Sequence, residues 1–428
     1  MLQKHFKHAG AAIAFAAVIA FAGCSQSGPR TVEPMINFAN TTSIDIVKAE
    51  LTDSNTVLHI NAHYRPGFWI KIAGDTYLEA DGKQYAMIGT DGIEPDSEFW
   101  MPESGEADFK LVFEPLPYST KQFDFIEGKD PRAFKLWDVD ITGKPLPEYP
   151  DGLPSELKRE PVDGPVPAPS LEIGRTTINF HLLPYRPEFS SEYSVYVNMM
   201  EGRQEEIPVK LDDAGNGTIT FDQYGPAEAY LVNTEMRVSY ASLNLYPGET
   251  VDCYVDMRRS GSLTMSNRKD LKTQSLPLHN GYYRDLDLML AKNNKYYGLQ
   301  LYTGNFADYH MSGQQYKDMV KSLYDAYSDS IQAADATQMQ KEYMQLQLQS
   351  QTLKAIAGYR NILGHNYRNV IGDWRAPIPQ DSITAHLSDE DFADVATWFD
   401  VTDPRLLMFE GSIGSMNWNK YGVPGDLS

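Results

Sequence analysis

The residues best suited to nucleophilic or redox chemistry in this 428-residue chain are its two cysteines, Cys24 and Cys253. Because they are far apart in the sequence, they do not form the C-x-x-C pair that supports thiol–disulfide exchange. Strand alternation in the segment 251–256 places Cys253 on one face with Val251 and Val255. This pattern predicts a buried, inert thiol, with a reactive thiol as the alternative.

Histidines are the next candidates, as metal ligands or proton carriers. The chain has no HExxH motif and no closely spaced His/Cys group, so we predict no metal site. His59 and His63 flank the end of a predicted strand and could share a site, although separate surface positions are the commoner arrangement. The histidines that follow residue 24 are His59, His63, His181, His279, His310, His365 and His386.

Two acidic pairs, Asp138/Asp140 and Asp285/Asp287, resemble the carboxylates of calcium sites and glycosidases. Neither lies in a calcium loop of the EF-hand type, and in a chain with 58 acidic residues a solvated face is the expected setting. No Gly-rich phosphate loop and no G-x-S-x-G motif is present. We therefore predict no catalytic, cofactor-binding or metal-binding residue, no cofactor, and a protein that is not an enzyme. A hydrolase with a dispersed site is an alternative.

The segment before Cys24 gives this cysteine a different role. Two lysines precede an apolar stretch over residues 9–22, which is shorter than the roughly 20 residues of a transmembrane helix. A basic head, an apolar middle and small residues before a cut are typical of a secretory signal. A cysteine at the cut predicts a lipoprotein, in which the signal peptide 1–23 is removed and Cys24 is acylated. An uncleaved anchor or an ordinary signal is the alternative.

The charge of the chain restricts its partners. With 37 basic and 58 acidic residues, the net charge is −21. Removal of residues 1–23 leaves 35 basic and 58 acidic residues, a net charge of −23. Such a chain repels phosphate backbones and anionic lipids, so we predict no nucleic-acid partner and a membrane contact through lipidated Cys24. Once Cys24 carries lipid, no intramolecular disulfide can form with Cys253.

The distribution of prolines, glycines and apolar residues predicts a multidomain α+β chain. Residues 24–40 are expected to form a tether. Two β-sandwich-like (Ig-like) domains are expected over 41–142 and 171–268, because short strands alternate with Gly, Pro and Asp breaks. Eight prolines between them predict an extended linker over 143–170, with an ordered crossover as the alternative. An α-helical region is expected over 277–428.

Turn and cap signals locate individual elements. Asp81-Gly82, between strands expected at 77–80 and 84–88, is the strongest hairpin signal in the chain. Ser312 and Gln315 form a capping box that predicts a helix over 312–331. Further helices are expected over 337–363, from Ser388, and from Asp403-Pro404.

The aromatic residues of the first β segment suggest a binding surface. Trp69, Trp100 and Trp137 could stack on sugar rings. In β-sandwiches such residues also fill the core or line a protein interface. The sequence alone leaves these roles open.

Eight short sequence segments, spread over most of residues 40–410, together resemble a known family. They are Trp69 to Ile72, Thr76 to Lys83, Met101 to Glu106, Phe113 to Pro117, Asp124 to Gly128, Phe306 to Tyr309, His365 to Arg368 and Trp398 to Asp400. Together they resemble the N-terminal, non-catalytic region of TlpA-like, thioredoxin-family lipoproteins of Gram-negative gut anaerobes. The resemblance implies thiol–disulfide exchange by a C-terminal thioredoxin-like domain with a C-x-x-C motif.

This chain departs from that family at the decisive position. It has no cysteine pair and ends about where the thioredoxin-like domain would begin, so no catalytic residue is carried over, and we expect the helical region to be truncated. Surface-exported lipoproteins of such bacteria tend to carry acidic residues after the acylated cysteine. Residues 25–30 contain none. We therefore expect an outer- or inner-membrane lipoprotein that faces the periplasm.

The leading functional prediction is a non-catalytic envelope lipoprotein, a periplasmic accessory module that binds or positions a protein partner. The prediction rests on the anchor, the missing C-x-x-C pair and the family resemblance. A surface glycan-binding lipoprotein is the alternative, suggested by the aromatic β segments.

Overall fold

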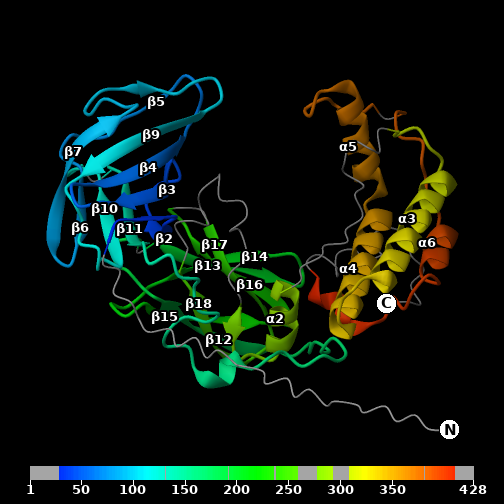
Figure 1. Ribbon diagram of the computed structural model, residues 1–428. Helices are drawn as coiled ribbons and strands as arrows, with labels where there is room; N and C mark the ends of the chain where they lie inside the picture. The colour runs from blue at the N-terminus through cyan, green and yellow to red at the C-terminus, as the bar shows by residue number, and fades with distance from the viewer. Residues whose placement is uncertain are drawn as a thin grey trace, which may run out of the picture.

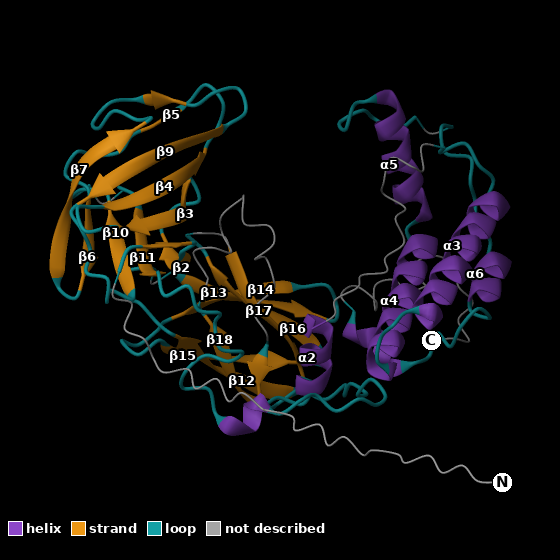
Figure 2. Cartoon of the chain, in the orientation of Figure 1, coloured by secondary structure: helices purple, strands orange, loops and turns teal. Residues whose placement is uncertain are grey.

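The computed structural model describes residues 28–130, 132–190, 192–235, 238–258, 277–292, 308–379 and 381–409. These residues are mostly β, with five α-helices, and form three regions along an arch (Figure 1). Two of the regions are built from strands, and the third from helices (Figure 2). The predicted signal peptide and its Cys24 lie outside the described residues.

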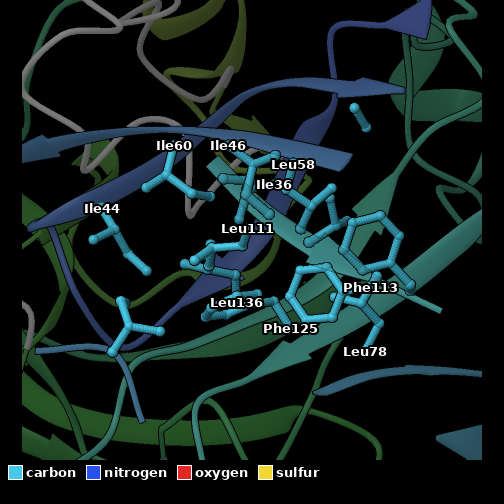
Figure 3. Close-up of a cluster of buried hydrophobic side chains, with 14 of the residues drawn as sticks. Ile36, Ile44, Ile46, Leu58, Ile60, Leu78, Leu111, Phe113, Phe125 and Leu136 are labelled. Atoms are coloured by element: carbon cyan, nitrogen blue, oxygen red, sulfur yellow. The ribbon is translucent and has the colours of Figure 1, made fainter. Parts of the chain in front are cut away.

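The first region is one nine-stranded antiparallel sheet that curls on itself, in the order β1-β3-β4-β9-β7-β6-β10-β11-β2. Apolar residues alternate along its strands and point inward, where they fill one core (Figure 3). The strands are β1 (Arg30–Val32), β2 (Met35–Ala39), β3 (Ile44–Leu51), β4 (Thr56–His63), β6 (Tyr77–Ala80), β7 (Lys83–Asp91), β9 (Glu106–Phe113), β10 (Gln122–Ile126) and β11 (Lys135–Asp140).

The first two strands fall inside the segment predicted as a tether, 24–40. β1 pairs with β3, and β2 pairs with β11, so residues 30–39 belong to the sheet. Ile36 and Phe38 are fully buried. The prediction of a tether was therefore wrong for these residues, because strands this short give too few alternating positions to stand out in a sequence.

The predicted hairpin at Asp81-Gly82 is confirmed. β6 and β7 pair on either side of it, and Asp81 and Gly82 have φ angles of 51° and 73°. Positive φ at both central residues is the requirement of a type I′ turn, which glycine and aspartate tolerate. A second, shorter ribbon joins β5 (Trp69–Ile70) to β8 (Phe99–Trp100) at one end of the first region (Figure 1).

The second region consists of two four-stranded sheets that contribute to one hydrophobic cluster. Phe38 and Trp137 of the first region join this cluster through Phe189, so the two β regions are in contact. One sheet has the order β15-β12-β18-β19 and the other β14-β13-β16-β17. The strands are β12 (Gly174–Leu183), β13 (Tyr193–Met199), β14 (Gln204–Val209), β15 (Asn216–Gln223), β16 (Ala227–Asn233), β17 (Val238–Leu245), β18 (Thr250–Asp256) and β19 (Leu278–His279).

β19 lies in the segment predicted to be helical from residue 277. It pairs with β18, with Cys253 opposite His279. A two-residue strand has no periodic pattern, which is why the sequence did not reveal it.

The proline-rich segment 143–170 takes the form of an ordered crossover. It contains the short helix η1 (Ser155–Lys158), and Leu153 and Leu157 are buried against Leu278. Farther on, Val166 joins the core of the helical region. The segment therefore packs against two regions, which corrects the picture of a free linker.

The helical region contains α3 (Gly313–Ala333), α4 (Gln338–Ala357), α5 (Tyr359–Ile371), α6 (Asp389–Val395) and η3 (Pro404–Met408). α2 (Arg284–Lys292) lies between this region and the sheets of the second region (Figure 1). The capping box of Ser312 and Gln315 is confirmed at the start of α3. The helix expected over 337–363 is two helices, because the chain breaks at Gly358, which ends α4 and begins α5.

The start of α6 gives a pH-dependent prediction. Asp391 accepts a hydrogen bond from Lys317 Nζ of α3 at 2.8 Å and one from the Ser388 backbone N–H at 2.9 Å. These contacts lower the pKa of Asp391 from 3.8 to about 2. Because the folded pKa is depressed, the stabilisation is present above the unfolded pKa and is lost as the pH falls through the folded one.

We expect Asp391→Asn to lower the free energy of unfolding by about 1–2 kcal/mol at pH 7. The difference from the unsubstituted chain should shrink between pH 4 and pH 2. Urea unfolding followed by circular dichroism over this range measures it. Asp325→Asn, which removes the exposed pair of Asp325 with Lys321, should cost less than about 0.5 kcal/mol. An equal loss at pH 7 and pH 2.5 would contradict the assignment.

Candidate binding site

An exposed aromatic surface lies at the end of the first region. In the β5–β8 ribbon, Trp69 is the direct partner of Trp100. Trp69 is 44% exposed and Trp100 is 60% exposed. Phe68 and Tyr64 are exposed beside them, with ring centroids 6.2 Å apart in an edge-to-face arrangement. We call these four residues the aromatic rim.

The inner face of the ribbon explains why the tryptophans point outward. Ile70 and Phe99 also form a direct pair, and successive side chains in a strand point to opposite faces. Ile70 is buried, and the Phe99 ring packs 6.2 Å from that of Phe109, between centroids. The ribbon is thus fixed to the core by one face and presents Trp69 and Trp100 on the other.

Charged side chains interrupt the apolar surface of the rim. The Arg65 guanidinium lies 5.9 Å from the centroid of the Phe68 ring. Lys71 and Glu98, each two residues from a tryptophan of the ribbon, are both exposed. The rim therefore combines ring-sized apolar patches with hydrogen-bonding groups, a combination typical of ligand sites.

Trp137, the third tryptophan considered from the sequence, is not part of this surface. It is buried at the contact between the β regions, where its ring lies edge-to-face with Phe189. Trp69 and Trp100 were considered as residues of an exposed binding surface, and both are exposed. Their pairing could not be read from the sequence, because it depends on the register of two strands far apart in the chain.

Arg186 connects the two β regions beside Trp137. From the loop after β12, its guanidinium donates to Asp124 Oδ2 at 2.6 Å and to Asp138 Oδ1 at 2.7 Å. Burial raises the pKa of Asp138, although the charge of Arg186 opposes this. Asp138 of the predicted pair Asp138/Asp140 is therefore part of an inter-region ion pair. The role of Arg186 had no signal in the sequence.

A second group of chemically capable residues is fully enclosed. His279 Nδ1 accepts a hydrogen bond from the Gly281 backbone N–H, which leaves the proton of a neutral ring on Nε2. Nε2 lies 3.1 Å from Asp287 Oδ2. Cys253 faces His279 across the strand pair, and all three side chains are buried. Asp287 also accepts hydrogen bonds from the backbone and side chain of Asn244.

This cluster resembles a Cys-His-Asp arrangement in composition, but its thiol is not activated. Burial, followed by the nearby charge of Asp287, raises the pKa of Cys253 to about 12. A nucleophilic cysteine needs a depressed pKa and access to solvent. The prediction of a buried Cys253 is confirmed, and the pairing of His279 with Asp287 was missed because their spacing matches no known motif.

We expect Cys253 to react with a thiol reagent at least about 1,000-fold more slowly in the native chain than in urea at pH 8. Its raised pKa keeps the thiolate fraction low, and its burial excludes the reagent. The measurement is the rate of Ellman's reaction on a Cys24→Ser chain, so that only Cys253 reports. Rapid labelling under native conditions would overturn the assignment of an inert thiol.

The two histidines predicted to flank a strand end do not share one site. His59 lies 3.0 Å from Glu50, and His63 contacts Asn61 and Glu106. An open cavity of about 400 Å³ lies beside His59 and is also lined by Asp91, Asp108, Phe109 and Lys110, among others. Its polar lining forms part of the outer face of the first sheet.

The remaining histidines are scattered. His181 stacks on Tyr254, and His365 contacts Trp374. Over the residues that the structure describes, no group of three or more His, Cys, Asp or Glu side chains is arranged to hold a metal ion. In the same residues, no helix combines the length and apolar character needed to cross a bilayer.

Comparison with known proteins adds little to this geometry. No family model and no curated protein matches the sequence. Among solved structures, the chain is similar to pullulanase type I from Bacillus subtilis str. 168 complexed with maltose, at 10% identity and a TM-score of 0.17 over 48% of this chain and 24% of that one. It is also similar to the pullulanase complexed with maltotriose from Anoxybacillus sp. LM18-11, at 11% identity and a TM-score of 0.17 over 46% and 24%. TM-scores this low do not indicate a shared overall fold.

Proposed function

We propose that this chain is a non-catalytic lipoprotein of the Gram-negative cell envelope, anchored through acylated Cys24 and facing the periplasm. It is an accessory, partner-binding module related to the TlpA-like lipoproteins. We infer an architecture of two β-sandwich-like domains followed by a helical domain, which the curled nine-stranded sheet, the pair of four-stranded sheets and the helical region support. The predicted lipid anchor at Cys24 supports the location in the envelope. The eight sequence segments named above support the relationship to TlpA-like lipoproteins.

The observation that carries a binding role is the contrast between two groups of residues. The first group has the side-chain types of a nucleophile, a base and an acid, but it is buried in the core: Cys253, His279 and Asp287. Trp69 and Trp100 instead lie outside on a ribbon fixed by its inner face. Large exposed aromatic surfaces are uncommon on soluble proteins and mark interaction sites. A protein organised in this way is suited to holding a partner.

The anchor is tested by growing cells that express the chain with an alkyne-tagged palmitate. The full chain should incorporate the label and sediment with membranes, whereas Cys24→Ala should carry no label. Label retained by Cys24→Ala would overturn the assignment of the acylated residue.

The absence of redox activity is tested separately with the purified chain. We expect no reduction of insulin disulfides above the background rate of dithiothreitol, because Cys253 is enclosed and has no partner cysteine. Catalysed reduction would overturn the non-catalytic assignment.

A further inference from the structure

We propose that the aromatic rim binds a neutral glycan chain, with Trp69 and Trp100 stacking on its sugar rings. This inference rests on the proposed binding function and names the class of ligand. A pyranose ring has a face of C–H groups and an edge of hydroxyl groups. An exposed indole ring complements the face, and adjacent charged side chains complement the edge.

The positions of the two tryptophans match such a ligand. As a directly opposed antiparallel pair, Trp69 and Trp100 extend from the same face of the ribbon. The backbone holds this register through a hydrogen bond from Met101 N–H to Phe68 O at 2.8 Å. Because Ile70 anchors the ribbon in the core, the tryptophans are held in place before a ligand arrives. Less entropy is therefore lost on binding.

The charges around the rim favour a neutral ligand over an anionic one. Three exposed glutamates lie around the ribbon, one just before β8, one on the loop that follows it and one at the start of β9: Glu98, Glu103 and Glu106. The whole chain is also strongly acidic. A uronic acid or phosphate polymer would be repelled. Lys71 and Glu98, in contrast, offer a donor and an acceptor to uncharged hydroxyl groups.

The composition of the rim also favours a sugar over a protein. Protein interfaces place their anchors in a continuous core from which charged residues are depleted. Here the exposed Lys71 and Glu98 lie just outside the strands of the ribbon, each two residues from a tryptophan, and Arg65 lies 5.9 Å from the Phe68 ring centroid, so charged groups divide the apolar surface. A ligand whose surface alternates between apolar faces and hydroxyl groups fits this division.

The test is affinity electrophoresis of the full-length, detergent-solubilised chain in native gels that contain a soluble neutral polysaccharide. A β-glucan, an α-glucan, a galactomannan and an arabinoxylan form the panel, and polygalacturonate is the anionic comparison. We expect retardation by at least one neutral polymer and none by polygalacturonate. Trp69→Ala and Trp100→Ala should each weaken binding about tenfold, and the double variant should abolish it.

Trp374→Ala is the matched control, because Trp374 is 61% exposed but lies beyond the end of α5, in the helical region. It should bind as the unsubstituted chain does. Equal circular dichroism spectra establish that the rim variants are folded. No retardation by any neutral polymer, retardation by the anionic polymer alone, or binding unchanged in the double variant would each overturn the inference. The palmitate and insulin experiments have independent readouts, so they show whether the proposed function fails as well.

Discussion

Replacing Arg186 with alanine is expected to lower the free energy of unfolding by about 3 kcal/mol. The substitution leaves the carboxylates of Asp124 and Asp138, which are largely shielded from water, without their shared cation. It also removes the guanidinium that lies 5.9 Å from the Trp137 ring centroid. Because the three groups join the two β regions, the loss should affect the contact between them. Urea unfolding monitored by tryptophan fluorescence measures the effect.

A matched control is Arg175→Ala, which removes an ion pair with Asp222 in which both side chains are more than half exposed. Its cost should be under about 1 kcal/mol, since solvent screens such pairs. Arg186→Lys should recover only part of the stability, because one ammonium cannot reproduce the forked contacts of a guanidinium. Equal effects of the Arg186 and Arg175 substitutions would show that the inter-region contact does not depend on Arg186.

The second large effect is expected at Asp287, where alanine should cost about 3–5 kcal/mol. Asp287 accepts a hydrogen bond from the Asn244 backbone N–H at 2.9 Å and faces His279 Nε2. Its removal leaves the Asn244 N–H without its acceptor and takes away the carboxylate that lies 3.1 Å from the buried His279 ring. Thermal unfolding by calorimetry measures the loss as a lower midpoint.

Asp287→Asn retains one acceptor oxygen and should therefore cost less than the alanine variant. A double-mutant cycle with His279→Ala separates the pairing from simple packing. If the two alanine substitutions added without coupling, the contact between His279 and Asp287 would not contribute to stability.

Local signals in the sequence predicted local structure well. The Asp81-Gly82 turn and the Ser312 capping box depend on residues within a few positions of each other, and the structure confirms both. The burial of Cys253 was predicted from the alternation of its own strand. Each of these features is determined by neighbours in the chain.

Features that depend on distant residues could not be predicted in this way. Arg186 and Asp124 are 62 residues apart, and no periodicity connects them. The aromatic rim lies between these cases, because Trp69 and Trp100 were considered as surface residues but their pairing required the ribbon. Apolar patterns thus indicated where elements lie, whereas polar partners that are distant in the sequence emerged only from the folded chain.

The ordered crossover has a consequence for how the chain is made. Asp163 accepts hydrogen bonds from the backbone N–H groups of Gln338 and Met339, the first two residues of α4. Val166 N–H donates to Glu342, 176 residues later in the chain. During synthesis the crossover leaves the ribosome long before α4 does. These contacts therefore cannot form until α4 has emerged. The crossover and α4 therefore cannot be separated by cutting the chain between its β and helical parts, because each half would lose a partner.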